Sequence, residues 1–234
     1  MKVIFAGPSL AGERPDRSGE IDFRPPAIFG DIEGAVNDGA NVIGIVDGRF
    51  QQVQSVWHKE ILSALAGGVQ VLGAASMGAL RAAECKAFGM IPIGKIARAY
   101  AEGRLWDDAD VALVHEGISD QYRAITEPMV NVQATAERLV ALGFITIADC
   151  AQLVHFAAAI HFSDRRVSTL FEPDSPLAWV AGPYATYHVD QKALDAKVLI
   201  DVVRGLSDQK TNREGPWRPR TSQYWKDARR LTLD

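Results

Sequence analysis

Residues 69–84, VQVLGAASMGALRAAE, place one serine where an apolar strand pattern changes into a helical pattern. Residues 69–73 form a nearly continuous apolar run, which is typical of a strand covered on both faces. From Met77 to Phe88 the apolar residues follow a helical period, and Gly89 supplies a helix stop. Ser76 therefore lies at the N-cap of a predicted helix, where it either caps the helix or is presented to a substrate.

The segments before this stretch predict the same kind of unit. Residues 2–6 and 41–46 are short apolar runs, each followed by a turn, and residues 31–39 have a helical pattern. Ser55 is a suitable cap for a further helix that would end near Leu65. Strands that alternate with helices predict an α/β fold with a small parallel sheet and flanking helices in the N-terminal half. Residues 10–26 are rich in Gly, Pro and Arg and predict a loop.

The second half has a different pattern. From Gly94 onward the periodicity is almost wholly helical, with predicted helices over 126–143, 147–160 and 190–205. Residues 172–188 contain three prolines and predict a loop. We therefore divide the chain into an α/β catalytic half, 1–90, and a mainly helical half, 91–234. We expect the two to form one compact unit.

The composition of the chain indicates the cellular compartment in which we expect the protein. The chain has 234 residues, of which 47% are hydrophobic, and no apolar run is long enough to span a bilayer. The N-terminal MKVIFAG is too short for a signal-peptide core. Cys85 and Cys150 lie in predicted helices, and we do not expect them to form a disulfide framework. These features predict a cytoplasmic protein that does not bind membranes.

Charge argues against nucleic acid as a ligand. The net charge is −4, although residues 204–234 hold eight Lys or Arg and only four Asp or Glu. The rest of the chain is therefore acidic, and it would repel a polyanion. For the basic C-terminal tail, a solvated and partly mobile terminus is favoured over a specific docking arm.

The environment of Ser76 suggests acyl chemistry. In a parallel sheet the carboxyl ends of the strands share one edge, so segments 47–59 and 74–78 are expected to meet there. The N–H of Met77 could stabilise an oxyanion at the N-terminus of its helix. Residues 74–78, AASMG, approximate the hydrolase turn G-x-S-x-G, but alanine replaces the first glycine. A serine that only caps its helix is the alternative.

A nucleophilic serine also needs a base. Lys59 is one candidate, but its pKa would have to fall by about three units to give a neutral amine, at a cost of about 4 kcal/mol. Its position away from the apolar stripe of its helix makes solvent exposure the simpler interpretation. The other candidates are His58, His115, His155, His161 and His188.

Four further residues could support such a site. Asp47 and Gly48 follow a predicted strand, where a tight turn and a site residue are both common. Arg81 and Glu84 are spaced i, i+3, so a structural ion pair is expected, although Arg81 could also reach a carboxylate near the sheet edge. No H-E-x-x-H, C-x-x-C, Walker A or G-x-G-x-x-G motif occurs, so neither a metal nor a cofactor is predicted.

The stretch from residue 47 to 103 contains SVWHKEI and SMGALRAAE and resembles the TfuA-like family. PPAIFGDI upstream and WDDADVAL and EPMVNV downstream extend the resemblance from the N-terminus to about residue 140. The resemblance implies that the protein acts together with a YcaO enzyme, which uses ATP to activate a peptide amide so that sulfur replaces its oxygen. It also implies hydrolysis of the C-terminal thiocarboxylate of a ubiquitin-like sulfur carrier, which releases sulfide for this peptide modification.

The resemblance further implies a serine–lysine pair, which matches Ser76 and Lys59. Met77 and an amide near Gly48 would then meet the oxyanion, and a cation such as Arg81 would help bind the anionic thiocarboxylate. Three functions stay open. They are a hydrolase of a protein thiocarboxylate, a non-catalytic adaptor that helps a YcaO enzyme engage its substrate, and a hydrolase of a small acyl compound.

Overall fold

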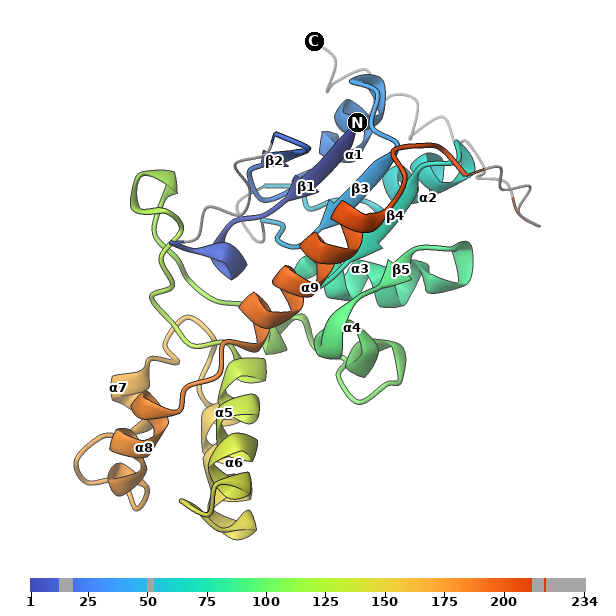
Figure 1. Ribbon diagram of the computed structural model, residues 1–234. Helices are drawn as coiled ribbons and strands as arrows, with labels where there is room; N and C mark the ends of the chain where they lie inside the picture. The colour runs from blue at the N-terminus through green and yellow to red at the C-terminus, as the bar shows by residue number, and fades with distance from the viewer. Residues whose placement is uncertain (13–18, 50–52, 212–216, 218–234) are drawn as a thin grey trace.

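A computed structural model describes residues 1–12, 19–49, 53–211 and 217 of the chain. Its centre is a five-stranded parallel sheet with the strand order β2-β1-β3-β4-β5 (Figure 1). The strands are β1 (Lys2–Phe5), β2 (Ile21–Arg24), β3 (Val42–Ile45), β4 (Gln70–Gly73) and β5 (Ile91–Pro92). The small parallel sheet predicted for the N-terminal half is confirmed.

Three of the predicted flanking helices cover one face of the sheet. They are α1 (Asp31–Asn37), α2 (His58–Ala66) and α3 (Met77–Cys85). Side chains alternate along each strand, so Val3 and Phe5 pack under these helices while Ile4 points to the opposite face. Both faces are apolar and buried, which explains the nearly continuous apolar runs of the strands.

The opposite face is covered by the last helix, α9 (Gln191–Gly205), which lies in front of the sheet in Figure 1 and runs along the strands. The carbonyl of Arg204, near its end, accepts a hydrogen bond of 2.8 Å from Lys2 Nζ at the start of β1. The helix is therefore antiparallel to the strands, and its N-terminus lies at their carboxyl edge. Beside it, α4 (Gly94–Ala101) is held by Asp195, whose Oδ2 accepts from the N–H of Ile96 at 2.7 Å.

The remaining helices form a separate lobe beyond the carboxyl ends of the strands (Figure 1). They are α5 (Met129–Ala141), α6 (Ile147–Ala159), α7 (Val167–Leu170) and α8 (Ala181–Thr186). Leu139, Leu153, Leu170 and Tyr184 are buried at its core. The predicted helical second half is confirmed. Short 3-10 helices occur at Pro8–Leu10, Lys86–Phe88, Asp108–Asp110, Ile118–Asp120 and Ala178–Val180.

Two predicted loops contain regular structure. Strand β2 falls within residues 10–26, where it pairs with β1. The amino-acid composition of this segment gives no sign of that backbone pairing. Helix α8 falls within residues 172–188. Its Pro183 stands in the first helical turn, where the missing N–H of proline costs nothing.

The predicted cap of the second helix is also wrong. Helix α2 begins at His58 with Trp57 as its N-cap, and Glu60 Oε1 accepts a hydrogen bond from the N–H of Trp57 at 3.1 Å. Ser55 lies outside the helix, and its hydroxyl accepts from Arg81 Nη2 at 3.4 Å.

Two sequence-based expectations concern the chain ends and membranes. Most of the basic C-terminal tail lies outside the described residues, although Trp217 is described and packs edge-on against Phe88, with ring centroids 5.2 Å apart. Within the described ranges no helix is both long and apolar enough to cross a bilayer. Cys85 and Cys150 are free thiols.

Candidate functional site

Ser76 stands on a sharp turn between β4 and α3. The strand ends at Gly73, Ala75 has a φ of +65°, and the helix begins at Met77. A positive φ is costly for a residue that carries a Cβ, so the turn holds backbone strain immediately before the serine. The G-x-S-x-G-like pattern thus corresponds to a strained strand-to-helix turn, with the strain at the residue before Ser76.

Glycine is required where this turn meets the neighbouring strand. A Cβ built on Gly78 would lie 1.7 Å from the carbonyl oxygen of Ile45. The N–H groups of Ser76 and Gly78 donate to the carbonyl of Val46 at 3.3 and 3.2 Å. This close approach fixes the first turn of α3 against the end of β3.

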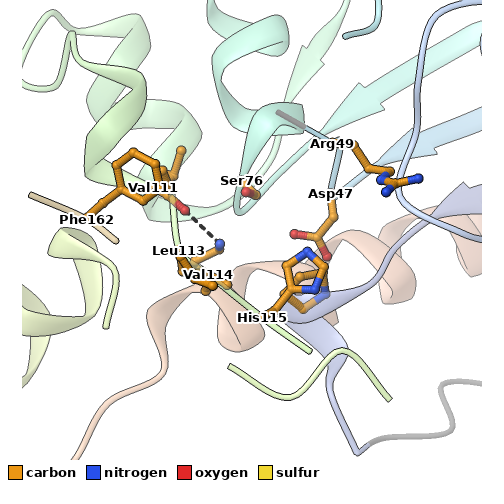
Figure 2. Close-up of a pocket in the computed structure, with 12 residues that line it drawn as sticks. Asp47, Arg49, Ser76, Val111, Leu113, Val114, His115 and Phe162 are labelled. Carbon is orange, nitrogen blue, oxygen red and sulfur yellow. Dashed lines mark hydrogen bonds between the residues drawn. The ribbon is translucent and has the colours of Figure 1, made fainter. Parts of the chain in front are cut away.

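The hydroxyl of Ser76 does not cap α3. No capping hydrogen bond forms at this helix end, and within the described residues the Ser76 side chain has no hydrogen bond. The residue is 4% exposed, and it lines a cavity of about 220 Å³ (Figure 2). The side chain is therefore available to the cavity, which favours a serine presented to a substrate over a serine that only caps its helix.

The cavity lies at the point where the strand order reverses. Strands β1 and β3 are neighbours, but the chain continues from β1 to β2 on one side and from β3 to β4 on the other, which leaves a crevice between their loops. Ligands of parallel α/β folds bind in such a crevice, outside the carboxyl ends of the strands. The loops after β1, β3 and β4 all reach it. Its lining comprises Pro8, Asp47, Gly48, Arg49, Ser76, residues 111–115, Phe162 and Lys192.

Asp47 joins two of these loops. Its Oδ2 accepts hydrogen bonds from the N–H groups of Gly7 at 2.8 Å and Ser9 at 3.0 Å, and its Oδ1 accepts from the Ser9 hydroxyl at 2.7 Å. The residue is 2% exposed and its carboxylate faces the cavity in Figure 2. Asp47 thus fixes the loop after β1 to the loop after β3.

Gly48 and Met77, the two predicted sources of oxyanion donors, lie in contact. A Cβ on Gly48 would come within 2.2 Å of Met77 Sδ, so a larger residue at position 48 would require this side chain to move. Neither backbone N–H donates to an acceptor within the described ranges. Two donors beside Ser76 are thus available to stabilise negative charge.

Lys192, in the first turn of α9, was not predicted as a site residue. It is 2% exposed, and its Nζ donates to the carbonyl of Val111 at 2.8 Å, the dashed line in Figure 2. Burial lowers its pKa below the ordinary lysine value, although Asp47, Asp190 and Glu127 act in the opposite direction. One sequence signal could have found it: Lys192 continues the buried stripe of Ala196, Leu199 and Val203 on the helix.

One of the candidate histidines lines this cavity. His115 Nδ1 lies 2.6 Å from the carbonyl of Glu116, and its ring packs edge-on against Tyr122. His58 and His188 instead pair with Glu84 and Glu127, at 2.8 and 2.7 Å. His155 and His161 do not line the cavity.

Lys59, Arg81 and Glu84 do not line the Ser76 cavity either. Arg81 Nη1 forms the expected i, i+3 ion pair with Glu84 at 2.7 Å, and its Nε donates to the carbonyl of Val56. Both residues line a separate cavity, together with Ser55, Met77 and Trp106. Lys59 is half-buried in the first turn of α2. In the described parts of the chain, no group of three or more His, Cys, Asp or Glu side chains could hold a metal ion.

The fold and site define a three-layer α/β protein with a buried serine on a strained turn at the reversal of its sheet. A comparison with protein families finds a match to the TfuA-like protein family over residues 47–166, slightly more than half of the chain. The chain therefore belongs to the TfuA-like family. No curated protein sequence matches it. The matched region contains Asp47, Ser76 and residues 111–115 of the cavity, and it ends before Lys192.

Proposed function

We propose that this protein hydrolyses the C-terminal thiocarboxylate of a ubiquitin-like sulfur carrier and so releases sulfide for a YcaO enzyme that thioamidates peptide backbones. Membership of the TfuA-like family supports the role beside a YcaO enzyme. One observation supports the enzymatic part of this proposal. The Ser76 hydroxyl does not cap α3, and the residue lines a cavity at the carboxyl edge of the sheet. We place the reaction in the cytoplasm, where the two thiols stay reduced.

The proposed reaction is acyl transfer to Ser76. Its Oγ attacks the carbonyl carbon, a C–O bond forms, and the N–H groups of Met77 and Gly48 meet the negative charge on the carbonyl oxygen. The C–S bond then breaks and hydrosulfide leaves. Water hydrolyses the acyl-serine ester and returns a carboxylate. A base must accept the Ser76 proton, and Lys59 is the base that the family resemblance implies.

A thiocarboxylate is an anion, so a cation beside Ser76 would favour its binding. Arg81, the cation expected from the sequence, is held by Glu84 and faces the separate cavity. Arg49 lines the Ser76 cavity, whereas Arg81 does not. We propose that Arg49 contributes to substrate binding.

The experiment is to mix the protein with a ubiquitin-like protein that carries a C-terminal thiocarboxylate and to measure sulfide. We expect Ser76→Ala to lower the rate by about 10³-fold or more, because the covalent route is lost. Melting temperatures of both proteins control for folding. A simple ester offered in parallel tests whether the substrate is instead a small acyl compound. Sulfide release near the normal rate by Ser76→Ala would refute the proposal.

A non-catalytic adaptor is the second candidate. Most exposed large apolar side chains among the described residues belong to the second half of the chain, including Ile147 at 79% exposure and Trp179 at 54%. Exposed apolar side chains on a lobe favour docking of a partner protein. If the protein acts only as an adaptor, Ser76→Ala will still increase the rate of a YcaO enzyme that is supplied with free sulfide.

A further inference from the structure

We propose that a second cavity, next to the Ser76 cavity, binds an apolar side chain of the peptide segment that precedes the thiocarboxylate. We name this cavity the side pocket. Its volume is about 410 Å³, and the residues that line it include Gly7, Leu10, Phe23, Ile118 and Tyr122. The proposal rests on the proposed function and names the part of the substrate that the protein would select.

The substrate of the proposed reaction is the end of a protein chain. The residues before the thiocarboxylate are covalently attached to it, so they must lie against neighbouring surface when the carbonyl carbon reaches Ser76. The Ser76 cavity, at about 220 Å³, has room only for the end of such a chain. Contacts to the preceding residues can supply binding energy for the reaction, and we expect them beside this cavity.

The first observation is that the two cavities share a wall. Gly7 lines the side pocket, and the next residue, Pro8, lines the Ser76 cavity. The N–H of Gly7 donates to Asp47 Oδ2 at 2.8 Å, and a Cβ built on Gly7 would lie 3.5 Å from Tyr122 Cγ. Asp47 of the Ser76 cavity and Tyr122 of the side pocket therefore both contact one glycine.

Further contacts cross the same wall. The His115 ring, in the Ser76 cavity, packs edge-on against the Tyr122 ring, with centroids 5.7 Å apart. Burial raises the pKa of Tyr122, and the charges of Arg49 and Asp47 also act on it, in opposite directions. In the view of Figure 2, Arg49, Asp47 and His115 lie on the same side of Ser76. A peptide that leaves the cavity on this side therefore meets the side pocket next.

The second observation concerns charge. Among the described residues that line the side pocket, Arg24 is the only charged one, and carboxylates already pair with it. Its Nε lies 2.8 Å from Asp22 Oδ2, and its Nη2 lies 2.9 Å from Asp38 Oδ2. In this part of the chain the side pocket offers no unpaired charge, so a charged substrate side chain would lose hydration there without compensation.

Apolar side chains supply much of the remaining surface. Leu10, in the 3-10 helix after β1, is 6% exposed, and Phe23 comes from β2. Ile118 stands at the start of a 3-10 helix and is 70% exposed. A cavity with apolar walls and an exposed isoleucine is suited to a large apolar side chain. We therefore assign the side pocket to a residue such as leucine.

The third observation is backbone strain in the turn that carries the Tyr122 ring. Gln121 and Tyr122 have φ angles of +53° and +58°, and neither residue is glycine. Such a backbone is unfavourable for a residue with a Cβ, and it persists where the surrounding structure holds it. The N–H of Tyr122 donates to the carbonyl of Gly117 at 3.1 Å. The strained turn thus places the ring between Gly7 and His115, on the shared wall.

The test varies the end of the substrate. A ubiquitin-like protein with a C-terminal thiocarboxylate is prepared with leucine at one of the four positions before its last residue and serine at the other three. We expect one leucine position to raise kcat/KM for sulfide release by about tenfold or more over the all-serine protein, because it buries an apolar side chain. Lysine at that position should give no such increase.

Ile118→Glu should change this preference, because it places an unpaired carboxylate beside the side pocket. We expect the advantage of leucine to fall by about tenfold and lysine to become the better residue at that position. Ile118 is exposed, so the variant should fold normally, which its melting temperature checks. Val198→Glu, at an exposed position of α9 outside the side pocket, is the matched control and should keep the preference for leucine.

Two substitutions test the Tyr122 ring. Tyr122→Phe keeps the ring and loses only the hydroxyl, so the preference for leucine should remain. Tyr122→Gly removes the ring and relieves the strain at this position, so the preference should fall by about tenfold even where the melting temperature does not.

Binding is also measured without turnover. Ser76→Ala protein is titrated with fluorescently labelled carriers that end in an ordinary carboxylate. The carrier with leucine at the preferred position should bind about tenfold more tightly than the all-serine carrier. Adding Ile118→Glu to Ser76→Ala should abolish this difference.

Two outcomes would overturn the assignment of the side pocket. They are equal kcat/KM and equal binding for all the leucine and serine carriers, and a preference for leucine that Ile118→Glu and Tyr122→Gly both leave unchanged. The failure of the proposed function looks different. If no carrier released sulfide but the leucine carrier still bound more tightly through Ile118, the reaction would be refuted while the peptide site remained.

Discussion

Ser76 and Met77, neighbours at the N-terminal end of α3, line two different cavities, and the charged groups of these cavities differ. In the cavity beside Arg81, the guanidinium pairs with Glu84, which also accepts from His58. In the cavity beside Ser76, the Lys192 amine has only a carbonyl oxygen, and the serine hydroxyl has no partner within the described residues. The paired charges beside Arg81 hold neighbouring segments together, whereas the unpaired polar groups beside Ser76 leave hydrogen-bonding capacity for the substrate that we propose.

The largest effect should come from Gly78→Ala, because Gly78 packs the first turn of α3 directly against the end of β3. A Cβ at this position would lie 1.7 Å from the carbonyl oxygen of Ile45, and backbone cannot move aside as a flexible side chain can. We expect a loss of about 3 kcal/mol or more in the free energy of unfolding, measured by denaturant titration.

Ala82→Gly, on the same helix, is the matched control for Gly78→Ala. It should cost only the helix propensity and one small buried methyl group, about 1–2 kcal/mol. Equal stability of Gly78→Ala and the wild type would mean that the turn is not held as closely as the structure has it.

Two glutamates, one buried and one exposed but paired, should give opposite pH dependence of stability. Burial raises the pKa of Glu60 to about 7, above its ordinary value of 4.5, although backbone N–H groups of Trp57 and Gly30 oppose this shift. The folded chain therefore keeps a proton that the unfolded chain loses between pH 4.5 and 7. Its contribution is complete below pH 4.5 and is lost as pH rises through 7, by up to about 3 kcal/mol.

Glu84 should show the reverse trend. Burial raises its pKa, but hydrogen bonds from His58 and Arg81 outweigh burial and hold the pKa below the ordinary value. Its contribution is present above that value and is lost as pH falls. Unfolding measurements on Glu60→Gln and Glu84→Gln, carried from about pH 8 down to well below pH 4.5, would separate the two. A Glu60→Gln protein with the same pH dependence as the wild type would contradict the assignment.

The smallest effect should distinguish the two arginines. Arg49→Ala should raise the KM for a thiocarboxylated carrier by about tenfold, because a cation is lost from the Ser76 cavity. Arg81→Ala should raise KM less and should instead lower the melting temperature, since it removes the bonds to Val56 and Glu84. If Arg81→Ala raised KM more than Arg49→Ala, then Arg81, as expected from the sequence, would be the cation that binds the substrate.

Much of the fold follows from local patterns. Strands β1, β3 and β4 and helices α5, α6 and α9 correspond to apolar runs and periodicities that are visible in the sequence. Strand β2 and helix α8 were missed because each is short and lies among residues typical of loops. Their stability comes from backbone pairing with β1 and from packing of Tyr184 in the lobe, and neither interaction leaves a periodic signal.

The turn at Ser76 and its convergence with Asp47 and Gly48 could be predicted from the sequence, because the carboxyl ends of parallel strands must share an edge. The charged groups that join them could be identified only from the packed structure. Burial and pairing depend on contacts between distant segments: α9 folds back over the sheet and brings Lys192 to the cavity, while Arg81 and Glu84 face another cavity and Lys59 lies outside the lining of the first. Spacing along the chain cannot report such contacts, since they arise from the packing of one helix against the opposite face of the sheet.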